Sequence, residues 1–413
     1  MRRLHQEAEA SLLTYGPADH PAGSVEVVET YGQVELEYAA IRKRCGLLDC
    51  PHRAIIAVSG KDRIDFLNRM VTQELKGLAP FRVRRSFWLN GKGRIDADLR
   101  IIDLPTRTLL ELDIHAAERT VESLTKYIIT EDVTIADWSA STHRISLIGP
   151  TAAELVMGLA HSAQGADASG PAFSELHPDR ACVVRLFDAE TVIYREDQCG
   201  RPGLELIVPT KHALTVYQRL VESGHDASHG NLSSSVLPEQ SRSELAKRTA
   251  LRPIGWHAYN IARIEAGTPI YNLDFGPDSL PAETGVLDDR VSFKKGCYLG
   301  QEIVARIQAR GHPKQVLVAI KFESKPDETS GFSLQPVTGA EITLAGGEEI
   351  IGQVTSSALS PSLSSSPVAF AQIKFAHLAP GTVVTTLLNG LRLQGTIQPT
   401  LGFALTQAAR RGV

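Results

Sequence analysis

A cysteine with two lysines beside it marks the most chemically informative stretch of this sequence. The stretch covers residues 291–314 and reads VSFKKGCYLGQEIVARIQARGHPK. Its pattern predicts a loop followed by a helix that begins near Gly300 and stops at Gly311, so Cys297 would lie just before a helix N-terminus. The helix dipole and the adjacent Lys294 and Lys295 would favour the thiolate, the nucleophilic form of cysteine. Taken alone, these local features fit a reactive thiol and a small buried core cysteine about equally.

A second group of polar residues lies on a predicted β-hairpin. In the run RRSFWLNGKGRIDADLRII, Asn90-Gly91 stands between two strand-like segments. This dipeptide predicts a tight turn in which both residues have positive φ. After the turn, apolar residues alternate with Asp96, Asp98 and two flanking arginines, so one face is polar. That face fits equally a solvent-exposed surface with ion pairs between strands and a wall of a ligand site.

The order of the elements that must position these residues predicts an α+β protein. Strand-like runs alternate with helical patterns through the first three quarters of the chain, and GQVELEYAAIRKRCGLLD predicts a helix that ends at Gly46. Later, short runs separated by Gly, Pro and Ser predict a small all-β barrel. We therefore expect a flexible N-terminal tail at 1–30, a body at 31–312 that can divide into two subdomains and carries a polar insertion at about 225–244, and a C-terminal barrel at 313–413.

Composition limits the classes of function. The chain has 413 residues, 43% of them hydrophobic, which supports two or three cores. A net charge of -4 gives no large positive field to attract nucleic acid or anionic lipid. No secretory signal and no apolar run of roughly 20 residues is present, so we expect a cytoplasmic protein with neither nucleic acid nor membrane as a partner. The 5 scattered cysteines, without a Cys-x-x-Cys pair, predict free thiols and no metal site.

Several motifs carry a resemblance to a known family. KGCYLGQE, residues 295–302, resembles the K-G-C-Y-x-G-Q-E signature of the YgfZ family, which shares the scaffold of the glycine-cleavage T-protein, an aminomethyltransferase. The resemblance extends over about residues 31–400 and includes Gly46-Leu47-Leu48-Asp49, ARIEAG at 262–267 and IGQVTSSALSP at 351–361. It implies a ferredoxin-like folate-binding body with a C-terminal β-barrel. It also implies tetrahydrofolate or a one-carbon derivative as ligand, and a role in maturation or repair of iron–sulfur enzymes, with iron–sulfur client proteins as partners.

The resemblance also implies roles for individual residues. Glu205, in the run GLELIVP, falls on the family's pterin-binding glutamate. A carboxylate can accept a ring N–H and an exocyclic amine of a pterin together; read without the family, Glu205 is an exposed partner of a lysine or arginine. The signature cysteine falls on Cys297, which we expect to be the reactive residue. Further catalytic candidates are Lys295 and Asp98, and further folate-binding candidates are Asn90, Arg263 and Tyr298.

Departures from the T-protein pattern bear on the choice of reaction. Where aminomethyltransferases commonly have G-Y-T-G-E, this chain has Asp197-Gln198-Cys199-Gly200-Arg201, and where they have G-G-I-x-D-D it keeps only Asp98 of the acid pair. The favoured hypothesis is therefore a tetrahydrofolate-binding protein of the YgfZ type. The alternative is a folate-dependent aminomethyl or methyl transferase with Asp98 as acid or base. A third hypothesis is an interaction module that has lost its ligand.

Overall fold

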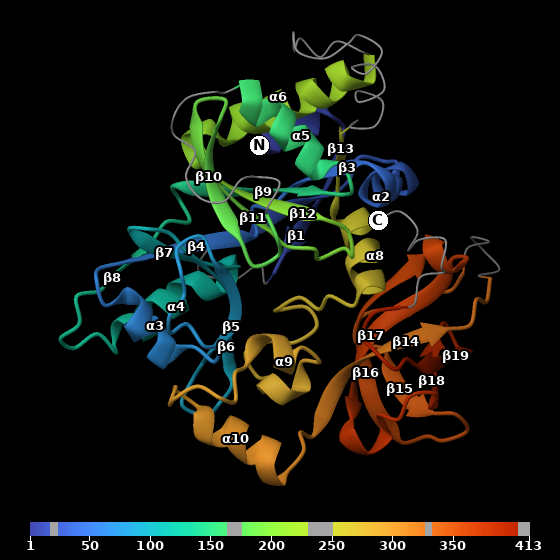
Figure 1. Cartoon of the computed structure of the whole chain (residues 1–413). Helices are drawn as coiled ribbons and strands as arrows, with labels where there is room; N and C mark the ends of the chain where they lie inside the picture. Colours follow the sequence, from blue (N-terminus) through green and yellow to red (C-terminus); the bar gives the residue numbers. More distant parts are fainter. Residues whose placement is uncertain (17–23, 163–175, 230–250, 327–332, 404–413) are drawn as a thin grey trace. The chain divides into compact units, whose positions relative to one another are not determined.

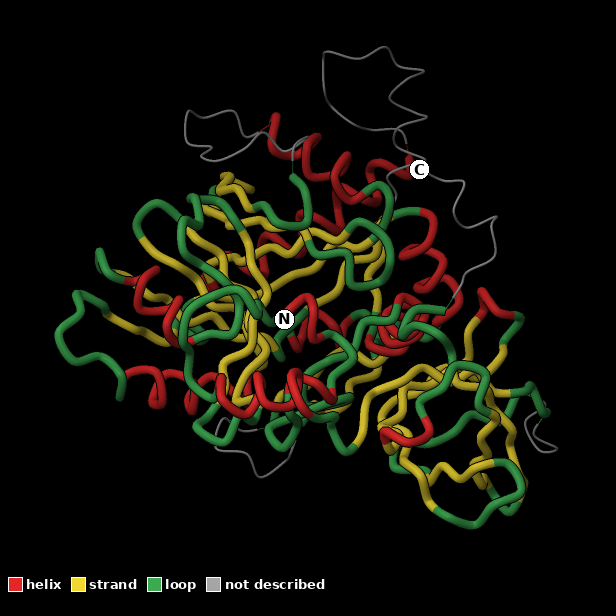
Figure 2. The backbone as a smooth tube through the Cα atoms, turned by 60° about the horizontal axis from the view of Figure 1, so that its bottom comes forward, coloured by secondary structure: helices red, strands yellow, loops and turns green. Residues whose placement is uncertain are grey.

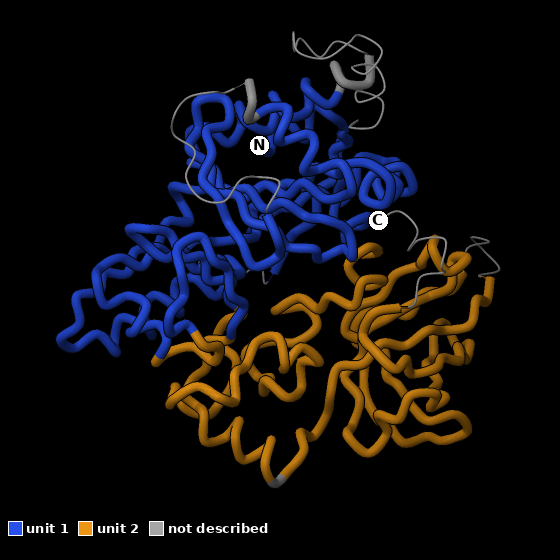
Figure 3. The backbone as a smooth tube through the Cα atoms, viewed as in Figure 1, with its two compact units in different colours: residues 1–68, 75–86, 99–259 blue, residues 69–74, 87–98, 260–413 orange. Residues whose placement is uncertain are grey.

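Strand and helix patterns along the chain produce the α+β fold that the sequence predicts (Figure 1). The computed structural model describes residues 1–16, 24–162, 176–229, 251–326 and 333–403. The chain forms two compact units (Figure 3). Unit 1 contains residues 1–68, 75–86 and 99–259, and unit 2 contains residues 69–74, 87–98 and 260–413.

A six-stranded sheet lies in unit 1. Its strand order is β10-β11-β12-β9-β3-β13; the β3–β13 pair is parallel and the other pairs are antiparallel. The strands are β3 (Cys45–Asp49), β9 (Thr142–Ile148), β10 (Ala181–Leu186), β11 (Ala189–Arg195), β12 (Gly203–Pro209) and β13 (Leu251–Ile254).

A second, five-stranded sheet has the order β5-β6-β7-β4-β8. It includes the predicted hairpin, since β5 and β6 are neighbours, and these two strands run on from unit 1 into unit 2. The strands are β4 (Arg53–Ser59), β5 (Val83–Leu89), β6 (Ile95–Asp103), β7 (Arg107–Asp113) and β8 (Thr134–Asp137).

Alternation along β12 divides its side chains between two layers. Leu204, Leu206 and Val208 belong to a core cluster shared with the helices α5 (Ala152–Ser162) and α6 (Thr210–His229). Ile207, on the opposite face, belongs to a cluster that also contains residues of β4, β6 and β7. Successive side chains of a strand point to opposite faces, so Glu205 shares the layer between the two sheets with Ile207.

The expectation of a flexible tail at 1–30 is wrong for the described part of that segment. His5 is 3% exposed, and its Nε2 lies 2.9 Å from Asp49 Oδ2. The hydroxyl of Tyr15 donates to Asp113 at 2.5 Å. Contacts with the body hold the segment in place. Its helix and strands are too short for the periodicity of apolar residues to reveal them. They are α1 (Arg2–Glu7), β1 (Ser11–Tyr15) and β2 (Val25–Thr30), with β1 and β2 antiparallel.

The helix expected to end at Gly46 is shorter than predicted. Helix α2 spans Val34–Lys43, and the following run forms β3, all of whose residues are buried. A short apolar run buried on both faces shows neither the helical nor the strand period, so its type could not be read locally. Among the described residues, α4 (Ile114–Thr125) also lies in unit 1, while α3 (Arg63–Met70) and α8 (Trp256–Ala266) each begin in unit 1 and end in unit 2.

Unit 2 does not follow the boundary expected at 312/313. Residues 260–312 group with the barrel and with the segments 69–74 and 87–98. The grouping has a local cause, because Thr72 Oγ1 donates to the carbonyl of Arg290 at 2.7 Å. The helices here are α9 (Leu287–Arg290) and α10 (Gln301–Arg310).

The predicted C-terminal barrel is confirmed (Figure 2). Its closed strand order is β14-β17-β16-β15-β18-β19. Of the predicted polar insertion, residues 225–229 belong to α6 and the remainder lies outside the described residues. No helix in the described ranges is long and apolar enough to cross a membrane. The barrel strands are β14 (Gln315–Phe322), β15 (Glu341–Leu344), β16 (Ile350–Ser360), β17 (Ser366–Lys374), β18 (Val383–Leu388) and β19 (Leu391–Ile397).

The N-terminal contact gives a stability prediction. His5→Ala removes a partner of the buried Asp49 carboxylate, so the free energy of unfolding should fall by about 1–3 kcal/mol. Arg3→Ala is the control, because Arg3 is 91% exposed and pairs only at the surface with Glu7; its effect should stay within about 0.5 kcal/mol. Chemical denaturation measures both variants. Equal losses would show that the His5 contact contributes nothing specific.

Candidate functional site

Glu205 is buried beside an arginine in the layer between the two sheets. Its β-sheet partners are Ser146 on β9 and Tyr194 on β11. Arg144 donates to Glu205 Oε2 through Nε at 2.8 Å and also through Nη2, and the Ser146 hydroxyl donates to the same oxygen. In the described part of the chain, Oε1 has no hydrogen-bond partner. One oxygen of this carboxylate can therefore still accept from a ligand.

The expectation of an exposed Glu205 with a cationic partner is wrong in one respect. An arginine is the partner, but Glu205 is only 1% exposed. Burial raises the pKa of this carboxyl, and the nearby Arg144 guanidinium opposes that rise. A charge held away from water in this way interacts strongly with any donor that reaches it.

The Glu205–Arg144 pair continues into a buried network of alternating charges. Arg144 Nη1 donates to Glu111 Oε1 at 2.6 Å. Arg53 binds both oxygens of Glu111, at 2.5 and 2.8 Å. The hydroxyl of Tyr194, next to Glu205 in register, is buried with no partner among the described residues. Sequence reasoning missed Arg144, although a single charge inside the apolar strand RISLI was a readable signal.

The polar side chains of β6 are buried, and Asp98 and Arg100 are paired with other charged side chains. Asp98 is 4% exposed and accepts from Arg290 Nε at 2.8 Å. Arg100 is 5% exposed and is paired with Glu196 at 2.8 Å. The solvent-facing interpretation is therefore wrong, and Asp98 is a buried carboxylate held by Arg290. As an acid or base it would have to act from within that ion pair.

The hairpin turn at Asn90 is longer than predicted. The prediction of positive φ at Asn90 and Gly91 is wrong, because in this turn the left-handed residue is Gly93, with φ 70°. Asn90 Oδ1 accepts from the backbone N–H groups of Lys92 and Arg94, at 3.0 and 3.2 Å, and Asn90 Nδ2 donates to Asp96 at 3.2 Å. Such side-chain bonds let asparagine shape a wider turn. The amide's role in folate binding stays a prediction.

Lys295 and Tyr298 anchor the loop that carries Cys297. Lys295 is 6% exposed, and its ammonium group donates to the carbonyls of Val71 and Gln73, at 2.6 and 3.1 Å. It also lies 5.3 Å from the centre of the buried Tyr298 ring. Burial lowers the pKa of Lys295 to about 8 and raises that of Tyr298 to about 12. Both predicted site residues hold the loop in place, and their catalytic or folate-binding roles stay predictions.

Cys297 is exposed between these anchors and the helix that follows. Helix α10 begins after Gly300 and ends before Gly311, as predicted. Gly300 has φ 79°, and a Cβ at this position would lie 2.8 Å from the Asn90 carbonyl oxygen and 3.0 Å from Gly93 Cα. This close glycine–glycine contact joins the loop to the hairpin turn. The loop is thus fixed on both sides of an accessible thiol.

Arg263 is fully buried in unit 2. Its Nη1 binds Asp274, and its Nε donates to Asn260 at 2.9 Å. Asp274 also accepts from the hydroxyls of Thr355 and Ser356 on β16. This placement favours a structural link between α8 and the barrel, and a folate contact through Arg263 stays a prediction.

The predicted site residues are divided between the two units. Glu205 lies in unit 1, and the others lie in unit 2: Asn90, Asp98, Arg263, Lys295, Cys297 and Tyr298. The hairpin turn and the Cys297 loop are brought together inside unit 2, through Gly93 and Gly300. Within the described residues, no group of three or more His, Cys, Asp or Glu side chains could hold a metal ion.

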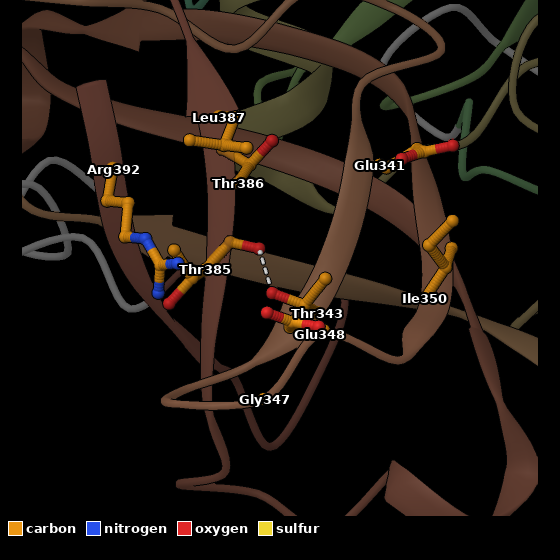
Figure 4. A pocket seen from close by; sticks show the side chains of 9 residues that line it. All are labelled: Glu341, Thr343, Gly347, Glu348, Ile350, Thr385, Thr386, Leu387 and Arg392. Carbon is orange, nitrogen blue, oxygen red and sulfur yellow. Dashed lines mark hydrogen bonds between the residues drawn. The ribbon is translucent and has the colours of Figure 1, made fainter. Parts of the chain in front are cut away.

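A hollow of about 390 Å³ lies on the barrel surface (Figure 4). None of the predicted site residues lines it. Thr343 donates to the carbonyl of Thr385 across its floor at 3.4 Å. The lining consists of Glu341, Thr343, Gly347, Glu348, Ile350, Thr385, Thr386, Leu387 and Arg392.

Comparisons with known proteins agree with this fold. The GCVT N-terminal domain family matches residues 3–233. The chain is 26% identical over 395 residues to an aminomethyltransferase of Symbiobacterium thermophilum, covering 94% of each chain. It is 27% identical to an aminomethyltransferase of Streptomyces avermitilis, over 96% of this chain and 93% of the relative. The crystal structure of the glycine cleavage system aminomethyltransferase T from Bartonella henselae matches with a TM-score of 0.76 at 24% identity, covering 96% and 95% of the two chains.

The exposure of Cys297 predicts selective alkylation. The other four cysteines are buried: Cys45, Cys50, Cys182 and Cys199. Burial raises the pKa of three of these thiols, Cys45, Cys50 and Cys182, to about 12, so at neutral pH they are both protonated and inaccessible. Mass spectrometry after brief treatment with an alkylating agent should find the label at Cys297, and Cys297→Ser should remove it. Equal labelling of a second cysteine in the folded protein would contradict this placement.

The Gly300 conformation gives a second prediction. Gly300→Ala should lower the free energy of unfolding by about 1–3 kcal/mol, because the new Cβ meets backbone and the residue has positive φ. Gly296→Ala is the matched control in the same loop, since its Cβ would meet nothing within 4 Å. Its effect should stay within about 0.5 kcal/mol. Denaturation curves that coincide for the two variants would contradict the close contact between hairpin and loop.

Proposed function

Since this chain belongs to the glycine-cleavage T-protein (GCVT) family, we propose that it binds tetrahydrofolate or a one-carbon derivative through Glu205. The observation that carries the proposal is the buried Glu205 carboxylate, whose Oε1 has no hydrogen-bond partner among the described residues. A pterin edge presents a ring N–H beside an exocyclic amine, which are donors suited to this acceptor. Tetrahydrofolate is the substrate used by aminomethyltransferases.

Folate-dependent aminomethyl transfer is the reaction that the comparisons favour. The relatives named aminomethyltransferase match the chain over nearly its whole length. Asp98 is the acid retained from the family's pair, and Arg290 holds it at 2.8 Å. An ionised carboxylate so placed could attract the positive charge of an iminium-like one-carbon unit or accept a proton. The altered G-Y-T-G-E segment at 197–201 argues against an unmodified T-protein reaction.

A second candidate function rests on Cys297. Its loop is anchored by Lys295 and Gly300 while the thiol stays exposed, an arrangement suited to a reactive group and poorly suited to core packing. With the K-G-C-Y-x-G-Q-E resemblance, this supports a YgfZ-type role in maturation or repair of iron–sulfur enzymes, with such enzymes as partners. Folate binding through Glu205 is common to both candidates.

Calorimetry with tetrahydrofolate tests the folate site. Glu205→Gln should weaken binding by about 1–3 kcal/mol, because an acceptor is replaced by a group that can present a donor to the pterin's own donors. Glu190→Gln on the neighbouring β11 is the control, since Glu190 is 64% exposed. Unchanged affinity in Glu205→Gln would remove Glu205 from the site. No saturable binding by the wild type would favour an interaction module that has lost its ligand.

Cys297→Ser separates the two candidate reactions. If the chain is an aminomethyltransferase acting through Asp98, Asp98→Asn should abolish transfer of a labelled aminomethyl carbon to tetrahydrofolate, and Cys297→Ser should leave it nearly intact. If the chain has the YgfZ-type role, Cys297→Ser should keep folate binding and fail to restore iron–sulfur enzyme activity in a cell lacking the endogenous protein. Full restoration by the serine variant would exclude the second candidate.

A further inference from the structure

The Glu205 carboxylate is held in a way that a pterin contact alone does not require. Oε2 accepts from two nitrogens of Arg144 and from the Ser146 hydroxyl, which fills its lone-pair positions. A pterin that donated two hydrogen bonds to one carboxylate would need both oxygens. Here only Oε1 is open to such a donor, so the bidentate pair expected from the sequence does not fit this arrangement.

We infer that Arg144 is the positioning residue of the site, an inference that rests on the proposed folate binding. Arg144 holds Glu205 through Oε2, so that Oε1 alone receives the ligand's N–H. Arg144 does not contact the ligand in this arrangement. It sets the orientation of the carboxylate and opposes the rise in pKa that burial causes. The site thus accepts a ligand edge that presents one strong donor to Glu205, with any second donor bound elsewhere.

The surroundings of Arg144 support a role beyond linking the sheets. A buried network that only stabilises the fold normally satisfies all its polar atoms. In this network two groups on neighbouring strands have no hydrogen-bond partner among the described residues. They are Glu205 Oε1 and the buried Tyr194 hydroxyl. Both belong to the layer in which Arg144 lies, so this layer retains groups that a ligand could still bind.

The charge on Glu205 depends on Arg144 more than on the rest of the network. Arg144 lies between two carboxylates, whereas Arg53 binds Glu111 and has no hydrogen bond to Glu205. Burial raises the pKa of Glu205 most, the Glu196 carboxylate raises it further, and Arg144 is the largest opposing influence. Removing Arg144 should therefore raise the pKa of Glu205 further, and a protonated carboxyl is a poor acceptor for the pterin N–H.

The test is the affinity for tetrahydrofolate, measured anaerobically by calorimetry across a pH series. Arg144→Met should raise Kd about tenfold or more near neutral pH, and the loss should shrink as pH rises and Glu205 ionises. The wild type, in which Arg144 opposes the rise in the pKa of Glu205, should show a smaller dependence on pH. Arg53→Met is the matched control, because it removes another guanidinium from the network, with its side chain 8% exposed against 4% for Arg144, but leaves the Glu205 contact. It should lower stability and leave both Kd and its pH profile unchanged.

If Arg144→Met does not fold, a double-mutant cycle with the conservative substitution Arg144→Lys still tests the inference. Arg144→Lys retains the charge but loses the paired nitrogens, so Kd should rise about fivefold in the wild-type background and by less than about twofold in a Glu205→Gln background. Equal effects in both backgrounds, or Arg144 variants with wild-type Kd and pH profile while Glu205→Gln binds weakly, would overturn the positioning role alone. A wild type that does not bind tetrahydrofolate would overturn the proposed function, and this inference with it.

Discussion

Charges buried between two β-sheets must be paired, and that constraint governs unit 1. Each carboxylate or guanidinium taken out of water carries a large desolvation cost, and removing one member of a buried pair typically costs about 3–5 kcal/mol. Arg53 and Glu111 come from β4 and β7 of one sheet, while Arg144 and Glu205 come from β9 and β12 of the other. Because the Arg144–Glu111 bond at 2.6 Å joins the two groups, the sheets can satisfy these charges only in one alignment. The position of Glu205 follows from that alignment.

Unit 2 treats its candidate reactive group in the opposite way. Glu205 is withdrawn from water, whereas Cys297 stays accessible in a loop that its buried neighbours anchor. Lys295 uses its charge on backbone carbonyls, and Gly300 allows the chain to approach the hairpin turn closely. A carboxylate gains strength as an acceptor when water is excluded, while a thiol that must meet another molecule gains from exposure. The two placements thus fit the two tasks that we propose for these residues, ligand recognition by Glu205 and group transfer or partner contact by Cys297.

Membership of the GCVT family accounts for the scaffold and leaves the chemistry to individual residues. The Bartonella henselae structure, at 24% identity, shares this fold, because packing tolerates exchange of apolar side chains of similar volume. A reaction depends on far fewer groups. In this chain the groups that we propose for it are the paired Asp98, the network around Glu205 and the exposed Cys297, and the fold can present each of them without the others.

The sequence by itself determined the elements whose signals are local. Glycine, proline and charge spacing placed α10 between Gly300 and Gly311, and alternation with turn residues placed the hairpin strands and the C-terminal barrel. Tertiary structure alone decided that the run after α2 is the buried strand β3, that the N-terminal segment docks on Asp49, and that the turn at Asn90 is wide. It also decided that Glu205 meets Arg144, 61 residues away in the chain. Such pairings depend on which strands become neighbours, and no local pattern of residues encodes that choice, because it is fixed by burial and charge pairing across the whole sheet.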